Sequence, residues 1–545
     1  MGGFAFVFGE VPPAELRGRL EELPPADFRG RGRTLLAPPL ALRLDEAADG
    51  ALDEGDGVVV ALHGWLSDGL PPAATTAEGL RRAWIERGEA AISDLRGEFT
   101  AAVYSRRDGL LRLARDLAGT RPLFLRRDGP LLLGATDVRG LDRRGISAFS
   151  IDEEAFALWR AGTPHPEKTC YAGVRRSPAG RVVSWRAVPD GAVVDSDTSL
   201  WDAPAERDPR ETTFEEDAEE LRGLLARAVE RAARGASPTV TLSGGLDSSA
   251  VWALAHRAAG ALAVSLRYPG LDCDEGPEIA SVLAACPGEA REIPLGPVTI
   301  GQIRTTTREV DLPHLPTLGH SMVLAGDARA AGRRIVLTGV GGDDLFAGTR
   351  AVASDLLLRG RLAALLRLLR RLRGRHGAGA LALLRSALLG PLSRRPLFGH
   401  HRASLEADLA ALRAGAALEA LEQAGALRGV EWRHPFLDAD VAAFAFAAAG
   451  CRHVEQGLPK SLLRGALGGL LPDAVLARPA KVTFDSAVET VAPDDPRLAG
   501  ALARLRGLDP GADAGRAAAP SPFEIADALF LDSRTSPGRP DGQAC

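Results

Sequence analysis

The chain has 545 residues, more than one ordinary hydrophobic core holds, so we expect at least two domains. Hydrophobic residues make up 46% and charged residues 25% of the sequence, which excludes a wholly disordered chain. The net charge of -5 excludes a generally basic nucleic-acid coat, and no apolar run reaches the length of about 18 residues that a membrane helix needs. The start lacks the basic segment of a signal peptide and the five cysteines are scattered, so we expect a cytoplasmic protein with reduced thiols.

Lysine is rare in this sequence. Only three of the 66 basic residues are lysines, namely Lys168, Lys460 and Lys481. In a chain so rich in arginine, a retained lysine indicates that a compact ammonium is needed rather than a planar guanidinium. For any one of these lysines, chance is an equally good explanation of its retention.

The first part of the chain, residues 1–205, carries the signals of a β-rich domain. Short apolar runs at residues 57–62 and 99–104 are followed by turn sequences, a pattern that predicts successive antiparallel strands. A polar run with two prolines at residues 202–211 has the composition of a linker. A charged amphipathic helix is predicted after it, at residues 214–234.

The pattern then changes to strands that alternate with glycine-rich turns and helices. Apolar strands are predicted at residues 239–242, 261–266 and 335–337. This alternation is typical of a parallel α/β sheet. We place the second domain at residues 206–510, with an Ala/Leu/Arg-rich helical insertion at about 355–428, and expect a partly disordered tail at residues 511–545.

The strongest local motif is SGGLDSS at residues 243–249, directly between a predicted strand and a helix. Adjacent glycines let backbone N–H groups approach an anion, and the helix N-terminus adds positive potential. Serine hydroxyls can donate to phosphate oxygens, whereas Asp247 suits a phosphate site only if a divalent cation lies between them, so we interpret it as a Mg²⁺ ligand. The alternative is an ordinary helix-capping turn. The sequence has no Walker A motif.

A second glycine-rich turn follows the strand at residues 335–337, with the sequence TGVGGDDLFAG at 338–348. The carboxyl ends of parallel strands share one edge of a sheet, where α/β proteins bind ligands. Asp247 and Asp343 could therefore hold Mg²⁺ on a pyrophosphate together. By itself, the second motif could be an ordinary loop.

These two motifs together resemble the synthetase domain of the asparagine synthetase family. The resemblance extends to EWRHPFLD at residues 431–438, to KSLLR at 460–464 and to LPDAVLAR at 471–478. RGEF at residues 96–99, LARD at 113–116 and GTRPL at 119–123 resemble the class II glutaminase domain of the same family. The resemblance implies an α+β Ntn-hydrolase-like sandwich, followed by an α/β adenine-nucleotide pyrophosphatase domain.

The resemblance also implies ATP and Mg²⁺ as cofactors, and roles for individual residues. Backbone groups of Leu242 and Ser265 would hold the adenine. Lys481 would reach the α-phosphate, and Glu431 would orient or deprotonate the attacking amine, although a salt bridge to Arg433 is an equal alternative for it. Further ATP-binding residues would be Ser243, Gly244, Gly245, Asp247, Ser248, Ser249, Gly339 and Gly341, with Asp247 and Asp343 on the metal.

Two departures from the family pattern narrow the expected function. The glutaminase fold uses an N-terminal cysteine as its nucleophile, but residue 2 is Gly and the first cysteine is Cys170, so we expect an inactive glutaminase domain. Val340 stands where asparagine synthetases carry Glu and β-lactam synthetases carry Tyr, and an apolar side chain performs no acid–base chemistry. The amine must then arrive with the substrate, which predicts ring closure rather than asparagine synthesis.

Two branches of the family close rings, the β-lactam synthetases and the lasso-peptide macrolactam cyclases. We favour the cyclase, because the residues at 478–484 resemble that branch and the helical insertion could form a wall for a folded peptide. The insertion could equally be a solvated hairpin. The expected partner is a precursor peptide, and a leader peptidase and a leader-binding protein are further candidates. We expect neither a nucleic acid nor a membrane as a partner.

Two other classes of protein stay open. Enzymes that thiolate tRNA share the pyrophosphatase fold but need a reactive cysteine pair, and Cys273 and Cys286 lack CxxC spacing. A catalytically inactive regulatory homologue is the other possibility, and the intact Asp247, Asp343 and Lys481 argue against it.

Overall fold

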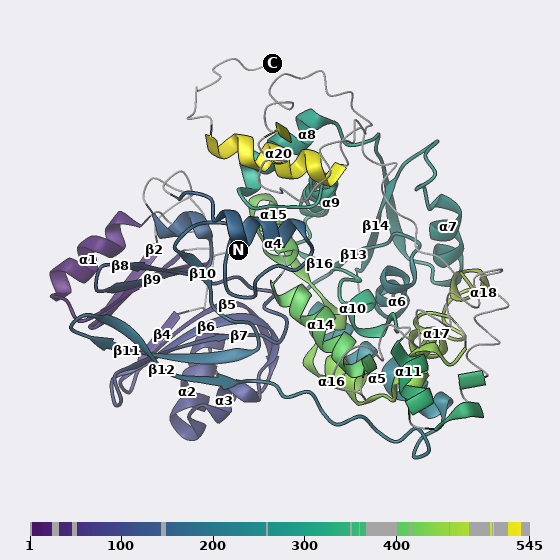
Figure 1. Cartoon of the computed structure of the whole chain (residues 1–545), viewed down its shortest axis with the longest axis horizontal. Coiled ribbons are helices and arrows are strands. Elements are labelled where there is room, and N and C mark those ends of the chain that lie inside the picture. The colour runs from purple at the N-terminus through teal and green to yellow at the C-terminus, as the bar shows by residue number, and fades with distance from the viewer. Residues whose placement is uncertain are drawn as a thin grey trace.

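The computed structural model describes residues 3–23, 32–45, 52–142, 149–257, 260–348, 351–358, 360–363, 365–366, 400–414, 416–456, 458–478, 502–503, 505 and 522–535. Two parts lie side by side in Figure 1, an antiparallel part that contains β1 to β12 and a part built on a parallel sheet. The connection after β12, near the lower edge of the view, leads to helix α5 (Phe214–Ala233).

The N-terminal part is a sandwich of two six-stranded sheets, as the sequence predicted. One sheet has the order β10 (Val174–Arg176), β8 (Phe124–Asp128), β9 (Leu131–Ala135), β1 (Phe4–Phe8), β3 (Leu40–Asp45), β2 (Gly32–Ala37). The other has the order β12 (Gly191–Ser199), β11 (Arg181–Val188), β7 (Leu110–Arg115), β6 (Arg96–Ser105), β5 (Val58–Asp68), β4 (Leu52–Gly55). Every pairing within both sheets is antiparallel.

Strand β1 shows how the sequence builds the sandwich. Phe4, Phe6 and Phe8 belong to the core between the two sheets, whereas Ala5 and Val7 belong to a second core on the opposite face. Successive side chains of a strand point to opposite faces, so a strand buried on both sides is apolar at every position. The helices of this part are α1 (Pro13–Glu22), α2 (Thr76–Arg87), α3 (Ala90–Ser93) and α4 (Glu153–Arg160).

The second part contains a five-stranded sheet in which all pairings are parallel. Its order is β15 (Glu289–Pro294), β14 (Leu262–Arg267), β13 (Thr239–Thr241), β16 (Ile335–Leu337), β17 (Glu431–Arg433). The chain moves outward from β13 to β14 and β15, then returns to the other side of β13 for β16 and β17. This reversal creates a crevice at the carboxyl ends of β13 and β16, where such sheets bind ligands.

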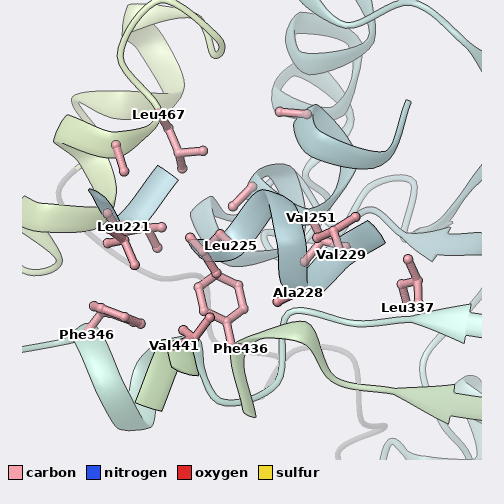
Figure 2. Close-up of a cluster of buried hydrophobic side chains, with 14 of the residues drawn as sticks. Leu221, Leu225, Ala228, Val229, Val251, Leu337, Phe346, Phe436, Val441 and Leu467 are labelled. Carbon is pink, nitrogen blue, oxygen red and sulfur yellow. The ribbon is translucent and has the colours of Figure 1, made fainter. Parts of the chain in front are cut away.

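Helix α5 anchors the core beneath that crevice. Leu221, Leu225, Ala228 and Val229 are buried on one face of α5, at the spacing of an amphipathic helix. Figure 2 shows these side chains directed toward apolar residues of several other elements, and the labelled ones are Val251, Leu337, Phe346, Phe436, Val441 and Leu467. The motif-bearing segments are thereby held against one common core. Around it lie α6 (Leu246–Ala255), α7 (Gly276–Ala285), α10 (Gly342–Phe346), α16 (Ala439–Ala447), α17 (Ser461–Ala466) and α18 (Asp473–Leu476). Helix α9 (Leu318–Ala330) contributes Leu324, Ala325 and Ala328 to a separate cluster with β14, β16 and β17.

The predicted helical insertion is described only in part, as α11 (Ala351–Leu358), α14 (His400–Ala414) and α15 (Ala416–Arg428). Helix α15 packs against α9 and β17, and Ala420 and Ala424 on it are buried. Its buried Glu419 forms an ion pair of 2.6 Å with Arg176 in the N-terminal sandwich. Residues 416–428 are therefore part of the core rather than a solvated hairpin.

A helix also lies in the tail that we expected to be partly disordered. Helix α20 (Pro522–Thr535) packs against α8 (Ile300–Val310), and it lies beside α8 in Figure 1. Its Phe530 stacks on Phe156 of the N-terminal part, with ring centroids 5.6 Å apart. The helix therefore adds to the hydrophobic core that both parts share.

Arg121 joins the two parts of the molecule through buried ion pairs. Its Nη2 lies 3.2 Å from Oε2 of Glu98 and 3.0 Å from Oε1 of Glu431, and its Nη1 pairs with Glu422 of α15. The same Nη2 donates to the backbone carbonyl of Trp432 at 2.8 Å. One guanidinium thus faces three carboxyl groups, so the cluster favours binding a proton. Burial raises the pKa of Glu98 to about 8, although Arg121 opposes that shift.

The stability of the protein is expected to depend on pH through Glu98. The folded state holds a proton that the unfolded state releases, so stability falls as the pH rises from about 4.5, the usual pKa, to about 8. We expect the melting temperature of Glu98→Gln to fall less over this range than that of the wild type, as measured by circular dichroism. The control is Glu86→Gln on α2, where the side chain is exposed and the wild-type slope is expected. Equal slopes for wild type and Glu98→Gln would contradict the proton assignment.

Candidate functional site

A cavity of about 650 Å³ lies at the carboxyl ends of β13, β14 and β16. Its volume falls in the range of about 300–1,000 Å³ that is usual for small-molecule and cofactor sites. Residues from both glycine-rich turns line it, together with α9, the segment before α17 and the end of α18. The strand order alone thus brings the two predicted motifs to one site.

The SGGLDSS turn is closed by its own hydrogen bonds. Ser243 Oγ and Ser248 Oγ lie 3.0 Å apart, Ser243 N donates to Ser248 Oγ at 3.1 Å, and Ser248 Oγ donates to the carbonyl of Gly245. Helix α6 begins at Leu246 with Gly245 at its N-cap. Gly244 has φ +75°, and a Cβ there would lie 2.8 Å from Cβ of Glu278, so only glycine fits. The result is a preformed anion cradle at a helix N-terminus.

The second turn packs directly onto Asp247 of the first. A Cβ at Gly342 would lie 2.5 Å from Cγ of Asp247, and a Cβ at Gly339 would lie 2.8 Å from Cβ of Asp247. The glycines are therefore required for contact between the two turns, a constraint set by packing rather than by flexibility. This contact brings Asp343 close to Asp247.

Lys460 lies between the two predicted metal ligands. Its Nζ is 2.5 Å from Oδ2 of Asp247 and 2.6 Å from Oδ1 of Asp343. Lys460 has φ +59°, a conformation that non-glycine residues adopt rarely and that occurs often at functional sites. Its position immediately before α17 directs the ammonium into the cavity wall.

The two carboxylates fit a magnesium ion. They converge on one cation position, which the ammonium of Lys460 fills, so Mg²⁺ would bind through the carboxylate oxygens that do not contact Nζ. Mg²⁺ is usually held by one or two carboxylates together with substrate phosphates. In the described part of the chain no group of three or more His, Cys, Asp or Glu side chains has metal-binding geometry, so phosphate oxygens would have to complete the coordination. Asp247 and Asp343 are the residues that would hold the ion.

Val340 lines the cavity in apolar surroundings. It packs in a cluster with Ala118 of the N-terminal part, Leu418 of α15 and Leu437. Its backbone N donates to Thr338 Oγ1 at 3.2 Å, which fixes the turn. The side chain at this position contributes shape to the cavity and no proton chemistry.

The structure brings most of the predicted nucleotide-binding residues to the cavity. Those that line it are Leu242, Ser243, Gly245, Asp247, Ser248, Gly339, Gly341 and Asp343. Three predicted residues do not line it. Gly244 faces α7, Ser249 is fully buried in α6, and Ser265 is buried on β14 between Val264 and Leu266, which do line it. Lys481 lies outside the described residues.

Glu431 is a correction to the sequence analysis. Its carboxylate pairs with Arg121 at 3.0 Å and with Arg433 at 3.1 Å, and it does not line the cavity. Residue 431 is the first of β17, opposite Ile335 at the start of β16, so it lies at the other end of the strands from the two turns. The salt bridge that was the alternative for this residue is the observed arrangement.

Sequence reasoning missed several residues of the cavity. Lys460 was recognised as a retained lysine and as part of a family motif, but not as a partner of Asp247 and Asp343. Arg478, two residues after α18, pairs with Glu275, the N-cap of α7, at an Nη1–Oε1 distance of 2.6 Å. This ion pair connects the segments around α7 and α18 that line the cavity. Tyr268 and His320 also line the cavity, and no motif in the sequence marked them.

Comparison with family models agrees with this geometry. The asparagine synthase model matches residues 220–506, which is more than half of the chain. The chain belongs to the asparagine synthase family. A glutamine amidotransferase domain model matches residues 72–193, so the N-terminal sandwich is the Ntn-hydrolase-like domain that the sequence predicted. Within the described residues, no helix has both the length and the apolar character to span a membrane.

The individual proteins that match this chain are only distantly similar to it. The protein is 28% identical over 189 residues to asparagine synthetase [glutamine-hydrolyzing] 3 of Bacillus subtilis (strain 168), a match over 33% of this chain and 28% of that protein. A solved glutamine phosphoribosylpyrophosphate amidotransferase from B. subtilis, complexed with ADP and GMP, is 12% identical with a TM-score of 0.26, over 44% of this chain and 60% of that one. A structure described as the allosteric regulatory enzyme of purine biosynthesis is 12% identical, with a TM-score of 0.25, over 55% of this chain and 81% of that one. The structural similarities are too low to carry an argument.

Lys460 is expected to be essential for ATP-dependent activity. Without its ammonium, Asp247 and Asp343 would repel each other and the incoming phosphates, and loss of one preorganised charge typically costs about a hundred- to thousand-fold in rate. We expect Lys460→Met to lose ATP consumption by about this factor while it stays folded. Lys168→Met, whose ammonium pairs with Glu154 at the surface, is the matched control and should be nearly normal. Wild-type turnover of Lys460→Met would show that the lysine has only a structural role.

Proposed function

We propose that this protein uses ATP to form an amide bond, by adenylating a carboxylate and transferring the acyl group to an amine. The observation that carries the proposal is the convergence of the anion cradle at residues 243–248 with Asp247, Asp343 and Lys460 in one cavity. Membership of the asparagine synthase family supports the same chemistry.

In this proposal the residues of the cavity have distinct roles. The hydroxyls of Ser243 and Ser248 and the N-terminus of α6 bind the phosphates. Asp247 and Asp343 hold Mg²⁺, which when bound neutralises phosphate charge. Lys460 keeps these two carboxylates together. A carboxylate oxygen of the substrate attacks the α-phosphorus and pyrophosphate leaves, after which an amine attacks the acyl carbon and AMP leaves.

The amine is proposed to arrive as part of the substrate rather than as ammonia from glutamine. A glutaminase of this class needs a cysteine thiolate. Among the described residues no cysteine lies in or beside β1, and the first in the sequence, Cys170, is buried in the core. Burial raises the pKa of its thiol to about 12, so it is not a thiolate at neutral pH. The N-terminal sandwich then serves as a scaffold, whose Ala118 and Arg121 support the cavity wall.

A substrate that carries both groups is joined into a ring. We infer that the carboxylate is an Asp or Glu side chain of a precursor peptide and that the amine is its N-terminus, giving a lasso-peptide macrolactam. Val340 lies in apolar surroundings and cannot perform acid–base chemistry on an amine. This supports ring closure over asparagine synthesis. A leader peptidase and a leader-binding protein are the expected partners, in the cytoplasm.

A second candidate is an amide ligase that acts on a small molecule, as β-lactam synthetases do. The cavity volume of about 650 Å³ favours it, since this space suits a nucleotide with a small acid better than one with a whole folded peptide. Only the reacting carboxylate and amine of a peptide would need to enter, however, so the volume is compatible with both candidates.

ATP–pyrophosphate exchange tests the proposed function. We expect exchange with synthetic peptides that have a free N-terminal amine and one internal Asp or Glu, and a product lighter by one water molecule. Exchange should disappear in Asp247→Ala, because the carboxylate faces the cavity rather than the core, and circular dichroism would verify folding. Peptides with Asn or Gln at the acidic position are the matched control. Exchange with small amino-acid-derived acids alone would favour the second candidate, and none with any acid would overturn the proposal.

Glutamine is expected not to be hydrolysed. The measurement is glutamate release by the purified protein in the presence of ATP and Mg²⁺. A Cys170→Ser variant provides the background rate, because Cys170 is the cysteine in the N-terminal part of the chain. If the wild type released glutamate faster than this background, Cys170 would be a reactive nucleophile. Ammonia from glutamine would then again be a candidate source of the amine.

A further inference from the structure

Two polar side chains meet in the wall of the cavity. Tyr268 follows β14 and His320 lies in the first turn of α9, and both are only 3% exposed. Tyr268 Oη and His320 Nδ1 are 3.0 Å apart, with ring centroids 5.5 Å apart. Both residues line the same cavity as Asp247 and Lys460. A hydrogen-bonded Tyr–His pair on the wall of a ligand site has the geometry of an oriented acid–base group.

Three of the acidic side chains that line the cavity form ion pairs with basic side chains of its wall. Asp247 and Asp343 contact Lys460, and Glu275 is paired with Arg478. Asp344 adjoins Asp343 in the same turn. Val340, in the same turn, is apolar. The second half of the proposed reaction nevertheless releases a proton, since an amine becomes an amide.

We propose that His320 is the base that accepts this proton, and that Tyr268 positions its ring. This inference rests on the proposed function. In the productive tautomer Nδ1–H donates to Tyr268 Oη, which leaves the lone pair of Nε2 as the acceptor. The amine nitrogen attacks the acyl carbon, the bond from that carbon to the AMP oxygen breaks, and the proton of the nitrogen passes to Nε2.

The surroundings of His320 keep the imidazole in its basic form. Burial lowers the pKa of His320, because the charged form loses its hydration. Leu324, one turn further along α9, and Leu421 and Trp432 line the cavity as well, so this side of it is largely apolar. Such a wall excludes the water that would otherwise hydrolyse an acyl-adenylate.

The decisive experiment compares adenylation with amide formation in the same protein. His320→Gln keeps an N–H that can donate to Tyr268 Oη but has no basic nitrogen. We expect it to retain ATP–pyrophosphate exchange with the peptide substrate, to lose amide product by about a hundred- to ten-thousand-fold, and to release AMP without product. Tyr268→Phe should lose about tenfold in product at unchanged exchange, since it removes positioning rather than the base. Added imidazole should restore part of the product in His320→Gly.

Matched variants separate this inference from its alternatives. His314→Gln is the control, because His314 is equally buried and bonded to Thr307 but does not line the cavity, and its AMP-to-product ratio should be normal. Asp344→Asn should also keep a normal ratio of AMP to amide product. If Asp344→Asn released AMP without product while His320→Gln kept the normal ratio, the base would be Asp344 and the inference would be overturned. Parallel loss of exchange and product in a folded His320→Gln would overturn it too. Absence of exchange in the wild type would count instead against the proposed function.

Discussion

The contact between two glycine-rich turns controls the architecture of the site. β13 and β16 are adjacent and parallel, so their following turns emerge at the same edge of the sheet. The turns approach so closely that neither Gly339 nor Gly342 leaves room for a Cβ beside Asp247. This packing holds Asp247 and Asp343 near each other, and the ammonium of Lys460 offsets the repulsion between the two carboxylates. The residues of the SGGLDSS turn and the Asp247–Asp343 pair are consequently packed together as one unit.

The N-terminal sandwich contributes to this unit although we propose that it has no glutaminase activity. Arg121 holds the backbone of β17 through the carbonyl of Trp432, and Ala118 packs against Val340 on the cavity wall. Breaking a buried ion pair by removing one partner costs about 3–5 kcal/mol, because a charge is left buried without compensation. The sandwich is therefore needed for the site on physical grounds, since its removal would expose charged and apolar surface beside the cavity.

The cavity has two chemically different sides. Carboxylates, an ammonium and serine hydroxyls gather at the glycine-rich turns, where phosphate charge has to be bound. Leu324, Leu421 and Trp432 also line the cavity, as does the Tyr268–His320 pair, and such apolar surroundings suit acyl transfer in the absence of water. The same crevice can thus serve both halves of a ligase reaction without a large movement of the sheet.

Much of this protein could be predicted from its sequence alone. Alternating strands, turns and helices indicated a parallel sheet, and the spacing of glycines and aspartates in the two turns indicated a phosphate and metal site, because these features are local. Contacts between segments far apart in the sequence were decided only by the tertiary structure. Glu431 is 310 residues from Arg121, and nothing near it in the sequence shows that this arginine would neutralise it at the domain interface. Lys460 is 213 residues from Asp247, and Tyr268 meets His320 across 52 residues. The sequence therefore determined which chemistry the chain can carry, while the order of the strands decided which side chains share a cavity, since only packing brings distant segments within hydrogen-bonding distance.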